Sequence, residues 1–353
     1  MKDLQQILNA LQSVPACDAV LATLVKVDGS SYRRPGARLL LMADGRRIGS
    51  ISGGCLEDDV IAHAHDVMAN GTPKTITYDT TTENDLVWGV GLGCHGVVRM
   101  LIEKLPPKPS WAETLRDNFR QRKPTELAVW WGEPAGMPPA RTSQGAQAGP
   151  SPHSQRGKPG PGTYLASDLV PKPSEMVFYQ TVPPPTALMI FGGGDDARPL
   201  ARFAKELGWH VTVADPRPAF ATAERFPEAD AVIVARPDEV PAGLAMGADT
   251  LAVIMTHHYR HDVPLVRSLL PCPLAYLGLL GPKKRTEKIL SDLVADGFVF
   301  TPAMHARLHA PVGLDLGADH PEEVALAILA EMQSVLKGRD ARPLRERLKP
   351  IHD

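Results

Sequence analysis

The sequence predicts an α/β protein with two folded parts, an N-terminal α+β domain and a C-terminal domain built on a doubly wound parallel sheet. Its 353 residues exceed the usual size of one domain. The first part mixes helical and strand patterns, whereas the last part alternates short aliphatic runs with helical stretches. The expected boundaries are residues 1–106 for the first domain, 107–185 for a Pro/Gly-rich linker or mobile segment, 186–340 for the second domain and 341–353 for a tail.

The charge and hydropathy patterns exclude several classes of partner. With 38 basic and 40 acidic residues, the net charge of -2 provides no field that would gather nucleic acid or an anionic membrane. The longest apolar run, 263–284, is interrupted by Arg267 and by prolines. The first 20 residues carry acid and amide groups where a signal peptide would need an apolar stretch. We therefore expect a soluble cytoplasmic protein without nucleic-acid or membrane partners.

In the first domain, six segments follow one another. An amphipathic opening helix precedes a buried strand and a hairpin that turns at Asp44 and Gly45. A second helix ends at Gly71, and two strands follow. The segments are 4–13 (helix), 19–27 (strand), 37–52 (hairpin), 56–71 (helix), 74–80 (strand) and 96–105 (strand).

The region between the domains is rich in Pro, Gly and Ser. Between Gly132 and Gly162 it holds few large aliphatic residues, too few to bury the apolar surface that ordering requires. Within the region we expect a short helix at 111–123 and a strand at 125–131. The remainder is expected to be a linker or a mobile loop.

In the second domain, short aliphatic and β-branched runs alternate with helical stretches. This rhythm is typical of parallel strands joined by crossover helices, so the domain should be Rossmann-like. The predicted strands are 187–191, 211–215, 231–235, 251–255 and 273–280.

A glycine-rich turn follows the first of these strands. Gly192, Gly194 and Ala197 have the spacing of a dinucleotide-binding turn, and Asp215 ends the next strand, where such a fold holds a ribose hydroxyl. Asp195 and Asp196 suit the helix dipole but compete with a phosphate. Two interpretations stay open: the turn binds a nucleotide or phosphate, or its glycines serve only tight turning and close packing.

Histidines follow the fourth strand of this domain, at the sheet edge where open α/β sheets bind ligands. His257 and His261 share one helical face and could hold a metal ion, with His258 and Asp262 beside them. The alternative is that these histidines are solvated or face a ligand. Cys272, between two prolines, is expected in the core.

A cysteine stands at a glycine-rich junction in the first domain. Gly53 and Gly54 precede Cys55 directly before the predicted helix at 56–71. Glycine lets a bound group approach the backbone, and a helix start leaves free N–H groups and lowers a thiol pKa. The acids at 57–59 oppose that activation. We expect a thiol that can ligate or react.

The segment "GVGLGCHG" has a similar frame. Cys94 follows Gly93 directly ahead of a predicted strand. For both cysteines an inert buried thiol is the alternative. The tract "SSYRRPGAR" supplies Arg33, Arg34 and Arg38, which suit a phosphate or a carboxylate, or lie on a solvated turn.

Five segments together resemble the xanthine dehydrogenase accessory proteins, the XdhC/CoxI family. They occur in the family's order and cover both predicted domains. They read "GSSYRRPGARLLLMADGRRIGSISGGCLEDDV", "GLGCHG", "IFGGGDDARPLARFAKELGWHVTVADPRPAF", "YLGLLGPKKR" and "PVGLDLGADHPEEVALAILAEM".

The resemblance implies a cytoplasmic maturation chaperone. It would bind the molybdenum cofactor, protect it while a sulfur ligand is installed, and deliver it to a xanthine dehydrogenase-type molybdoenzyme. The resemblance also implies a cysteine desulfurase as the sulfur donor. It further implies that the chain forms a homo-oligomer, namely a homodimer. No catalytic residue is assigned, and Cys55 and Cys94 are candidate molybdenum ligands. The candidate cofactor-binding residues are Gly53, Gly54, Cys55, Gly93, Cys94, Arg33 and Arg34, with Gly192, Gly194 and Asp215 in the second domain for the cofactor or a nucleotide.

Two other functions remain open. One is an NAD(P)-dependent oxidoreductase with Cys55 or His257 at a domain cleft. The other is a metal or redox sensing scaffold. Neither accounts for both glycine-framed cysteines, so the chaperone interpretation is preferred.

Overall fold

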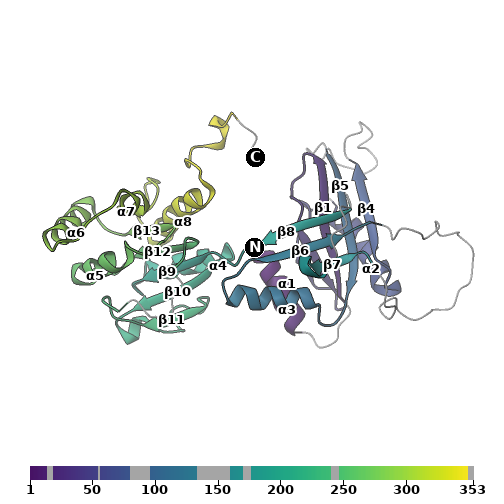
Figure 1. Cartoon of the computed structure of the whole chain (residues 1–353), viewed down its shortest axis with the longest axis horizontal. Helices are drawn as coiled ribbons and strands as arrows, with labels where there is room; N and C mark the ends of the chain where they lie inside the picture. The colour runs from purple at the N-terminus through teal and green to yellow at the C-terminus, as the bar shows by residue number, and fades with distance from the viewer. Residues whose placement is uncertain are drawn as a thin grey trace, which may run out of the picture. The chain divides into compact units, whose positions relative to one another are not determined.

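The computed structural model describes residues 1–13, 19–54, 56–79, 96–132, 160–169, 176–239 and 246–348. The chain forms two compact units, Met1–Pro184 and Pro185–Asp353, and each is described by itself (Figure 1). The predicted site residues Cys55, Gly93 and Cys94 lie outside the described residues. Within the described ranges, no helix is both long and apolar enough to span a bilayer.

The first unit contains an antiparallel five-stranded sheet in the order β3-β2-β1-β5-β4. The predicted hairpin is confirmed, since Leu40 pairs with Ile48 and Gly45 takes a positive φ of 83° in the turn. The strands are β1 (Ala19–Gly29), β2 (Arg38–Met42), β3 (Arg47–Gly49), β4 (Lys74–Asp79) and β5 (Gly96–Leu105).

Alternating residues of β1 face two different cores. Val20, Ala22 and Leu24 pack against α2 (Glu57–Asn70), whose buried side chains recur at helical spacing. Leu21 faces the opposite side, where α1 (Lys2–Ser13) packs. Helix α2 ends at Gly71 in the left-handed conformation, as its sequence predicts.

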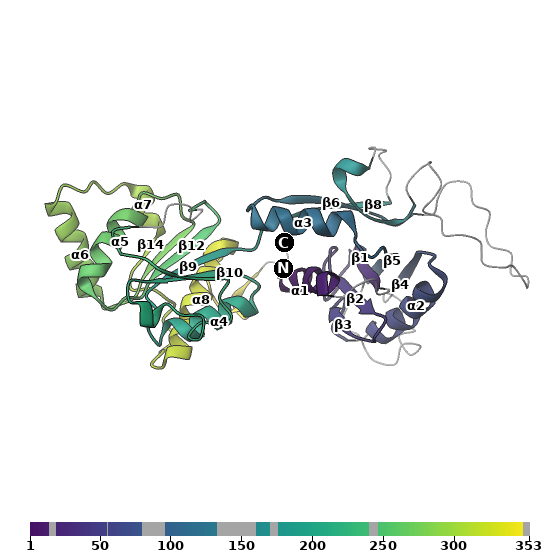
Figure 2. The same cartoon turned by 90° about the horizontal axis from the view of Figure 1, so that it is seen from below.

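The region predicted as a linker is folded wherever the structure describes it. It contains α3 (Ser110–Arg120) and a second antiparallel sheet, in the order β7-β6-β8, beside the five-stranded sheet (Figure 2). Trp111, Leu115 and Leu127 share a core with α1. The expectation of a linker over 107–185 is therefore corrected for these residues: its few apolar side chains suffice because the neighbouring sheet completes their core. The strands are β6 (Thr125–Trp130), β7 (Gly162–Leu165) and β8 (Val177–Val182).

Two buried polar side chains lie where the two sheets meet. Arg38 Nη1 donates to Gln180 Oε1 of β8 at 2.9 Å, but the Arg38 Nε and Nη2 atoms are buried without a hydrogen-bond partner. Glu103 of β5 accepts hydrogen bonds from the Thr163 backbone N at 3.0 Å and the Thr163 hydroxyl at 2.5 Å. Burial lowers the pKa of Arg38 to about 10, against the opposing effect of Glu103. Burial likewise raises the pKa of Glu103.

The second unit contains a six-stranded parallel sheet in the order β11-β10-β9-β12-β13-β14. In chain order this is 3-2-1-4-5-6, the arrangement of a Rossmann domain, so the predicted fold is confirmed. The strands are β9 (Ala187–Phe191), β10 (His210–Asp215), β11 (Ala231–Val234), β12 (Thr250–Ile254), β13 (Tyr276–Leu279) and β14 (Leu308–His309).

Helices cover both faces of this sheet (Figure 2). Leu188 and Ile190 face the core shared with α4 (Ala197–Glu206) and α8 (Pro321–Lys337). Met189 and Phe191 face the core shared with α5 (Tyr259–Leu269) and α6 (Lys283–Ala295). Since helices bury both faces, the strands are continuous apolar runs and not alternating ones.

One carboxylate links α8 to the far strands of this sheet. Glu331 accepts hydrogen bonds from the Tyr276 hydroxyl at 2.5 Å and from the Gly313 backbone N at 2.9 Å, and it pairs with His309 Nδ1 at 3.1 Å. The His309 ring stacks on the Tyr276 ring with centroids 4.2 Å apart. These contacts satisfy the polar groups that the core encloses.

Candidate functional site

One end of the five-stranded sheet gathers the segments that carry the glycine motifs of the first unit. Gly29, which ends β1, pairs with Gly96, which begins β5, and Asp79, which ends β4, pairs with Val97. The segment with Cys94 therefore leaves and re-enters the sheet at this end. A Cβ atom at Gly96 would overlap the carbonyl oxygen of Ser30, so this close approach requires glycine.

The turn before α2 lies at the same end. Strand β3 ends at Gly49, opposite Leu39 near the start of β2, and the chain then turns toward α2. Gly54 takes a φ of 108°, which favours glycine. A Cβ atom at Gly53 would lie 3.6 Å from the ring of Tyr32, an exposed side chain in the segment between β1 and β2. The described flanks of both cysteine motifs, at Gly53 and Gly96, therefore lie close to the segment that begins at Ser30.

Glu57 and Ser52 hold this turn together. The Glu57 carboxylate accepts hydrogen bonds from the Ser52 and Gly54 backbone N atoms at 2.9 and 3.0 Å, and also from the Ser50 and Ser52 hydroxyls. The Ser52 hydroxyl in turn accepts from the backbone N atoms of Gly54 and Leu56 at 3.1 and 3.2 Å. The N–H groups of Ser52, Gly54 and Leu56, expected to be free for a ligand, are thus engaged within the protein.

The same contacts lower the pKa of Glu57. Partial burial acts to raise the pKa of Glu57, but hydrogen bonds from Ser52 and Ser50 outweigh it and hold that pKa below its ordinary value. In the sequence, Glu57 stands out only as a charge that opposes thiol activation. Its position three residues after Gly54 is the available signal, since a Glu at the start of a helix can accept from the backbone N–H three residues before it.

The three arginines of the neighbouring tract have different surroundings. Arg33 Nη2 lies 3.7 Å from the Asp3 carboxylate of α1, and Arg34 is exposed. Arg38, predicted to suit an anionic ligand, is instead buried between the two sheets of this unit. Of the three arginines in this tract, only Arg33 and Arg34 therefore lie near the protein surface.

In the second unit, the glycine-rich turn lies at the carboxyl ends of β9 and β12, where the strand order reverses. A Cβ atom at Gly192 would lie 2.5 Å from the Met255 carbonyl oxygen, and one at Gly193 would overlap the Phe220 carbonyl oxygen. At Gly194 a Cβ atom would meet no atom within 4 Å. Close packing therefore explains the first two glycines, and Gly194 faces open space.

Asp215 is engaged by the protein itself. Its carboxylate accepts hydrogen bonds from the Gly193 N at 2.7 Å and from the Arg217 N, Nε and Nη2 atoms at 2.8, 2.9 and 2.8 Å. Partial burial acts to raise the pKa of Asp215, but these hydrogen bonds lower it on balance. Because a carboxylate has about four acceptor positions, none is left for a ribose hydroxyl in this arrangement.

Two acids directly before α4 pair with neighbouring loops. Asp196 Oδ2 lies 2.8 Å from His257 Nε2, across the point where the strand order reverses. Asp195 Oδ1 lies 2.8 Å from Arg225 Nη2. These carboxylates occupy the helix N-terminus at which a dinucleotide-binding fold receives a phosphate.

The histidine segment forms no metal cluster among the residues that the structure describes. His258 and His261 have ring centroids 4.4 Å apart, and His257 takes a φ of 56°. Burial lowers the pKa of His261, and His258 adds to this effect. Within the described ranges, no group of three or more His, Cys, Asp or Glu side chains is arranged to hold a metal ion. The metal alternative for His257 and His261 thus receives no support there.

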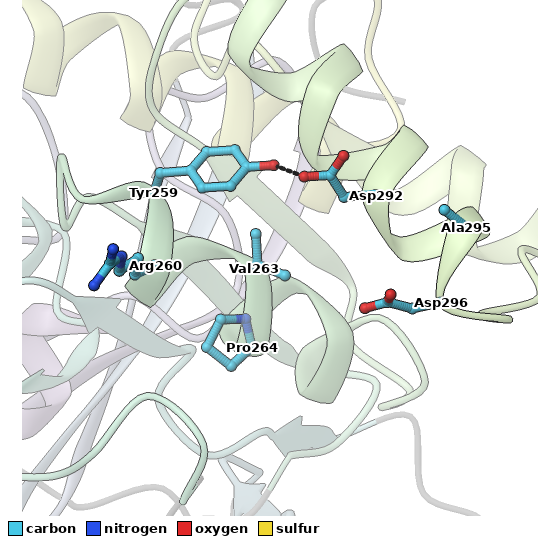
Figure 3. A pocket seen from close by; sticks show the side chains of 7 residues that line it. All are labelled: Tyr259, Arg260, Val263, Pro264, Asp292, Ala295 and Asp296. Carbon is cyan, nitrogen blue, oxygen red and sulfur yellow. Dashed lines mark hydrogen bonds between the residues drawn. The ribbon is translucent and has the colours of Figure 1, made fainter.

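A groove of about 440 Å³ runs between α5 and α6 (Figure 3). The Tyr259 hydroxyl donates to the Asp292 carboxylate across it, and Arg267 pairs with Asp296 at 2.7 Å. Its acids are therefore paired within the protein, and none of its lining residues belongs to the glycine-rich turn. The geometry assigns no ligand to this groove.

We expect NAD, NADH, NADP and NADPH at about 1 mM to leave the melting temperature unchanged to within about 1 °C, since a ligand that binds the native state must raise it. The physical reasons are the saturated carboxylate of Asp215 and the acids at 195 and 196. Thermal unfolding followed by differential scanning fluorimetry checks this. A saturable rise of several degrees would contradict it and would favour the oxidoreductase alternative.

The fold and site define a two-unit α/β protein in which an α+β unit with glycine-framed cysteine motifs precedes a Rossmann unit. The chain belongs to the XdhC and CoxI family. The family model described as "XdhC and CoxI family" matches residues 16–79, and the one described as "XdhC Rossmann domain" matches residues 188–332.

Individual relatives extend over nearly the whole chain. A protein of Bacillus subtilis, named as a probable xanthine dehydrogenase subunit, is 34% identical, over 89% of this chain and 92% of its own. The molybdenum cofactor insertion chaperone PaoD of Escherichia coli is 25% identical, over 90% of this chain and 83% of its own. The crystal structure of a xanthine dehydrogenase from Bacillus halodurans is similar with a TM-score of 0.75 and 30% identity, over 98% of this chain and 99% of that one.

Proposed function

We propose that this protein is a maturation chaperone that binds the molybdenum cofactor, protects it during sulfuration and delivers it to a xanthine dehydrogenase-type molybdoenzyme. The observation that carries the proposal is that described residues flanking both cysteine motifs, Gly53 and Gly96, lie near the segment 30–32 at one end of the five-stranded sheet. Two relatives support it, since one is named as a molybdenum cofactor insertion chaperone and the other as a xanthine dehydrogenase subunit.

The residues at this end suit the two kinds of group that the cofactor presents. The thiolates of Cys55 and Cys94 are soft ligands for molybdenum and its sulfur. Gly53, Gly54 and Gly93 allow the backbone to approach a bulky ligand closely. Arg33 and Arg34 on the neighbouring segment are the cations for a phosphate of the cofactor.

The proposal includes where the protein acts and with which partners. A cysteine desulfurase would supply the sulfur, and the chaperone would act as a homodimer in the cytoplasm. Cofactor binding is assigned to the domain at 1–106, and docking of partners is left to the Rossmann domain at 186–340. An encounter of this kind must be reversible, because a carrier has to release its cargo.

Replacing Cys55 or Cys94 by Ala is expected to weaken cofactor binding by about ten-fold or more, the equivalent of one lost metal ligand interaction. The measurement is an anaerobic titration of the purified full chain with isolated molybdenum cofactor. Cys272→Ala is the matched control, since Cys272 donates to the Ser268 carbonyl and burial raises the pKa of its thiol. Equal binding by all four proteins would reject both cysteines as ligands, and no binding by the unsubstituted protein would reject the proposed function.

A further inference from the structure

Neighbouring acids of α2 have very different surroundings. Glu57 receives hydrogen bonds from two backbone N–H groups and two hydroxyls of the turn that precedes it. Asp58, the next residue, is 95% exposed in its side chain and pairs only with Arg47, at 3.6 Å, among its described ion pairs. Both are acids close to position 55, but only Glu57 is bonded to the turn. Substituting each in turn therefore distinguishes the effect of the hydrogen bonds to the turn from the effect of a nearby negative charge.

The turn is built around the Glu57 carboxylate. Backbone N–H groups that converge on one point form an anion site, as they do at phosphate-binding turns. Here the N–H groups of Ser52 and Gly54 converge on a carboxylate of the protein itself. The Ser52 hydroxyl then fixes the N–H groups of Gly54 and Leu56, the two residues that flank Cys55.

We propose that Glu57 is the positioning residue of the turn that carries Cys55, and that it acts as an internal anion which excludes external oxyanions from the N–H groups of that turn. A ligand that approaches the turn would then meet the Cys55 thiol, because the backbone N–H groups that could bind an oxyanion already bind Glu57. This inference deepens the proposed function, on which it rests for the identity of the ligand: the turn takes the soft metal and sulfur end of the cofactor and leaves its phosphate to other groups.

The first test needs no cofactor. Site-resolved alkylation of the full chain by iodoacetamide, quantified by mass spectrometry, measures the reactivity of Cys55, with Cys272 as the internal reference. Glu57→Ala is expected to raise the Cys55 rate about five-fold or more, because the turn loosens and thiol access follows. Asp58→Ala is expected to stay within about two-fold, since it removes the same charge without touching the turn.

A conservative pair of variants keeps the test decisive if circular dichroism shows that Glu57→Ala unfolds the first unit, a change that Cys272 in the second unit would not report. Glu57→Gln retains one acceptor oxygen and should give an intermediate Cys55 rate, whereas Asp58→Asn should match the unsubstituted protein. Equal acceleration by the substitutions at 57 and 58 would show a charge effect alone and overturn the inference. An unchanged Cys55 rate in Glu57→Ala would overturn it too.

A second readout addresses ligand choice. In the anaerobic cofactor titration, Glu57→Ala should weaken binding about ten-fold and Asp58→Ala should not, since only the first loses the turn. Glu57→Ala should also show a larger thermal shift with inorganic phosphate than the unsubstituted protein, and an equal shift would overturn the exclusion of oxyanions. If the alkylation pattern holds while the unsubstituted protein binds no cofactor, the positioning inference stands and the proposed function fails.

Discussion

Gly192→Ala is expected to destabilise the second unit by about 4 kcal/mol or more, whereas Gly194→Ala should change its stability by no more than about 1 kcal/mol. At Gly192 the new Cβ atom would meet the Met255 carbonyl oxygen at 2.5 Å, and the φ of 117° is one that L side chains rarely adopt. At Gly194 the Cβ atom would enter open space. The two glycines belong to the same sequence motif and receive the same substitution. A difference in stability between the two variants therefore reflects the packing around each glycine.

Urea unfolding of the full chain measures both effects when it is followed by hydrogen exchange of peptides from the second unit, since four of the five tryptophans lie in the first unit. Gly193→Ala should resemble Gly192→Ala, because its Cβ atom would overlap the Phe220 carbonyl oxygen. If Gly192→Ala and Gly194→Ala were equally stable, the packing explanation of this turn would be wrong. A loss of ligand binding in Gly194→Ala without loss of stability would point to a binding role for that glycine.

Arg38→Met and Glu103→Leu are each expected to destabilise the first unit by about 3 to 5 kcal/mol, the usual effect of leaving a buried polar partner uncompensated. Both side chains are almost fully buried, at 3% and 6% exposure. Removing Arg38 leaves Gln180 without its donor, and removing Glu103 leaves the two donors of Thr163 unpaired.

The double variant should be less unstable than the sum of the singles by about 1 to 3 kcal/mol, since neither charge is then left alone. Arg99→Met is the matched control: Arg99 lies in β5 and pairs with Asp28 at 2.8 Å, but that pair is partly exposed. Its expected effect is about 1 kcal/mol or less. Strict additivity of Arg38→Met and Glu103→Leu would show that the two side chains do not interact.

The raised pKa of Glu103 adds a pH dependence to this prediction. Because the folded protein binds this proton more tightly than the unfolded chain, the resulting stabilisation is fully present below the ordinary pKa of 4.5 and is lost as the pH rises through the raised value. The unfolding free energy of the unsubstituted protein should therefore fall as the pH rises from acidic to neutral, and it should fall more than that of Glu103→Gln. A difference that stays constant with pH would contradict the direction of the shift.

Elements whose determinants are local could be predicted from the sequence. The aliphatic runs at 187–191 and 251–255 indicate buried parallel strands because helices cover both faces of such a sheet. Gly45 and Gly71 predict a turn and a helix end because glycine readily adopts the left-handed conformation there. The strand predicted at 125–131 is confirmed as β6. By contrast, β7 and β8 lie in a region whose average composition resembles a linker, and their core is completed by residues distant in sequence.

The candidate site divides in the same way. The amino-acid sequence establishes which residue types are present: the glycine-framed cysteines, the arginine tract and the Rossmann turn. The three-dimensional packing is needed to see that Arg38 is buried while Arg34 is exposed, although only four positions separate them. The same packing pairs Asp215 with the Gly193 backbone N and Glu103 with Thr163, residues that lie far apart in the sequence. Burial and hydrogen-bond partners depend on which segments meet in space, and a local pattern carries no information about residues far along the chain.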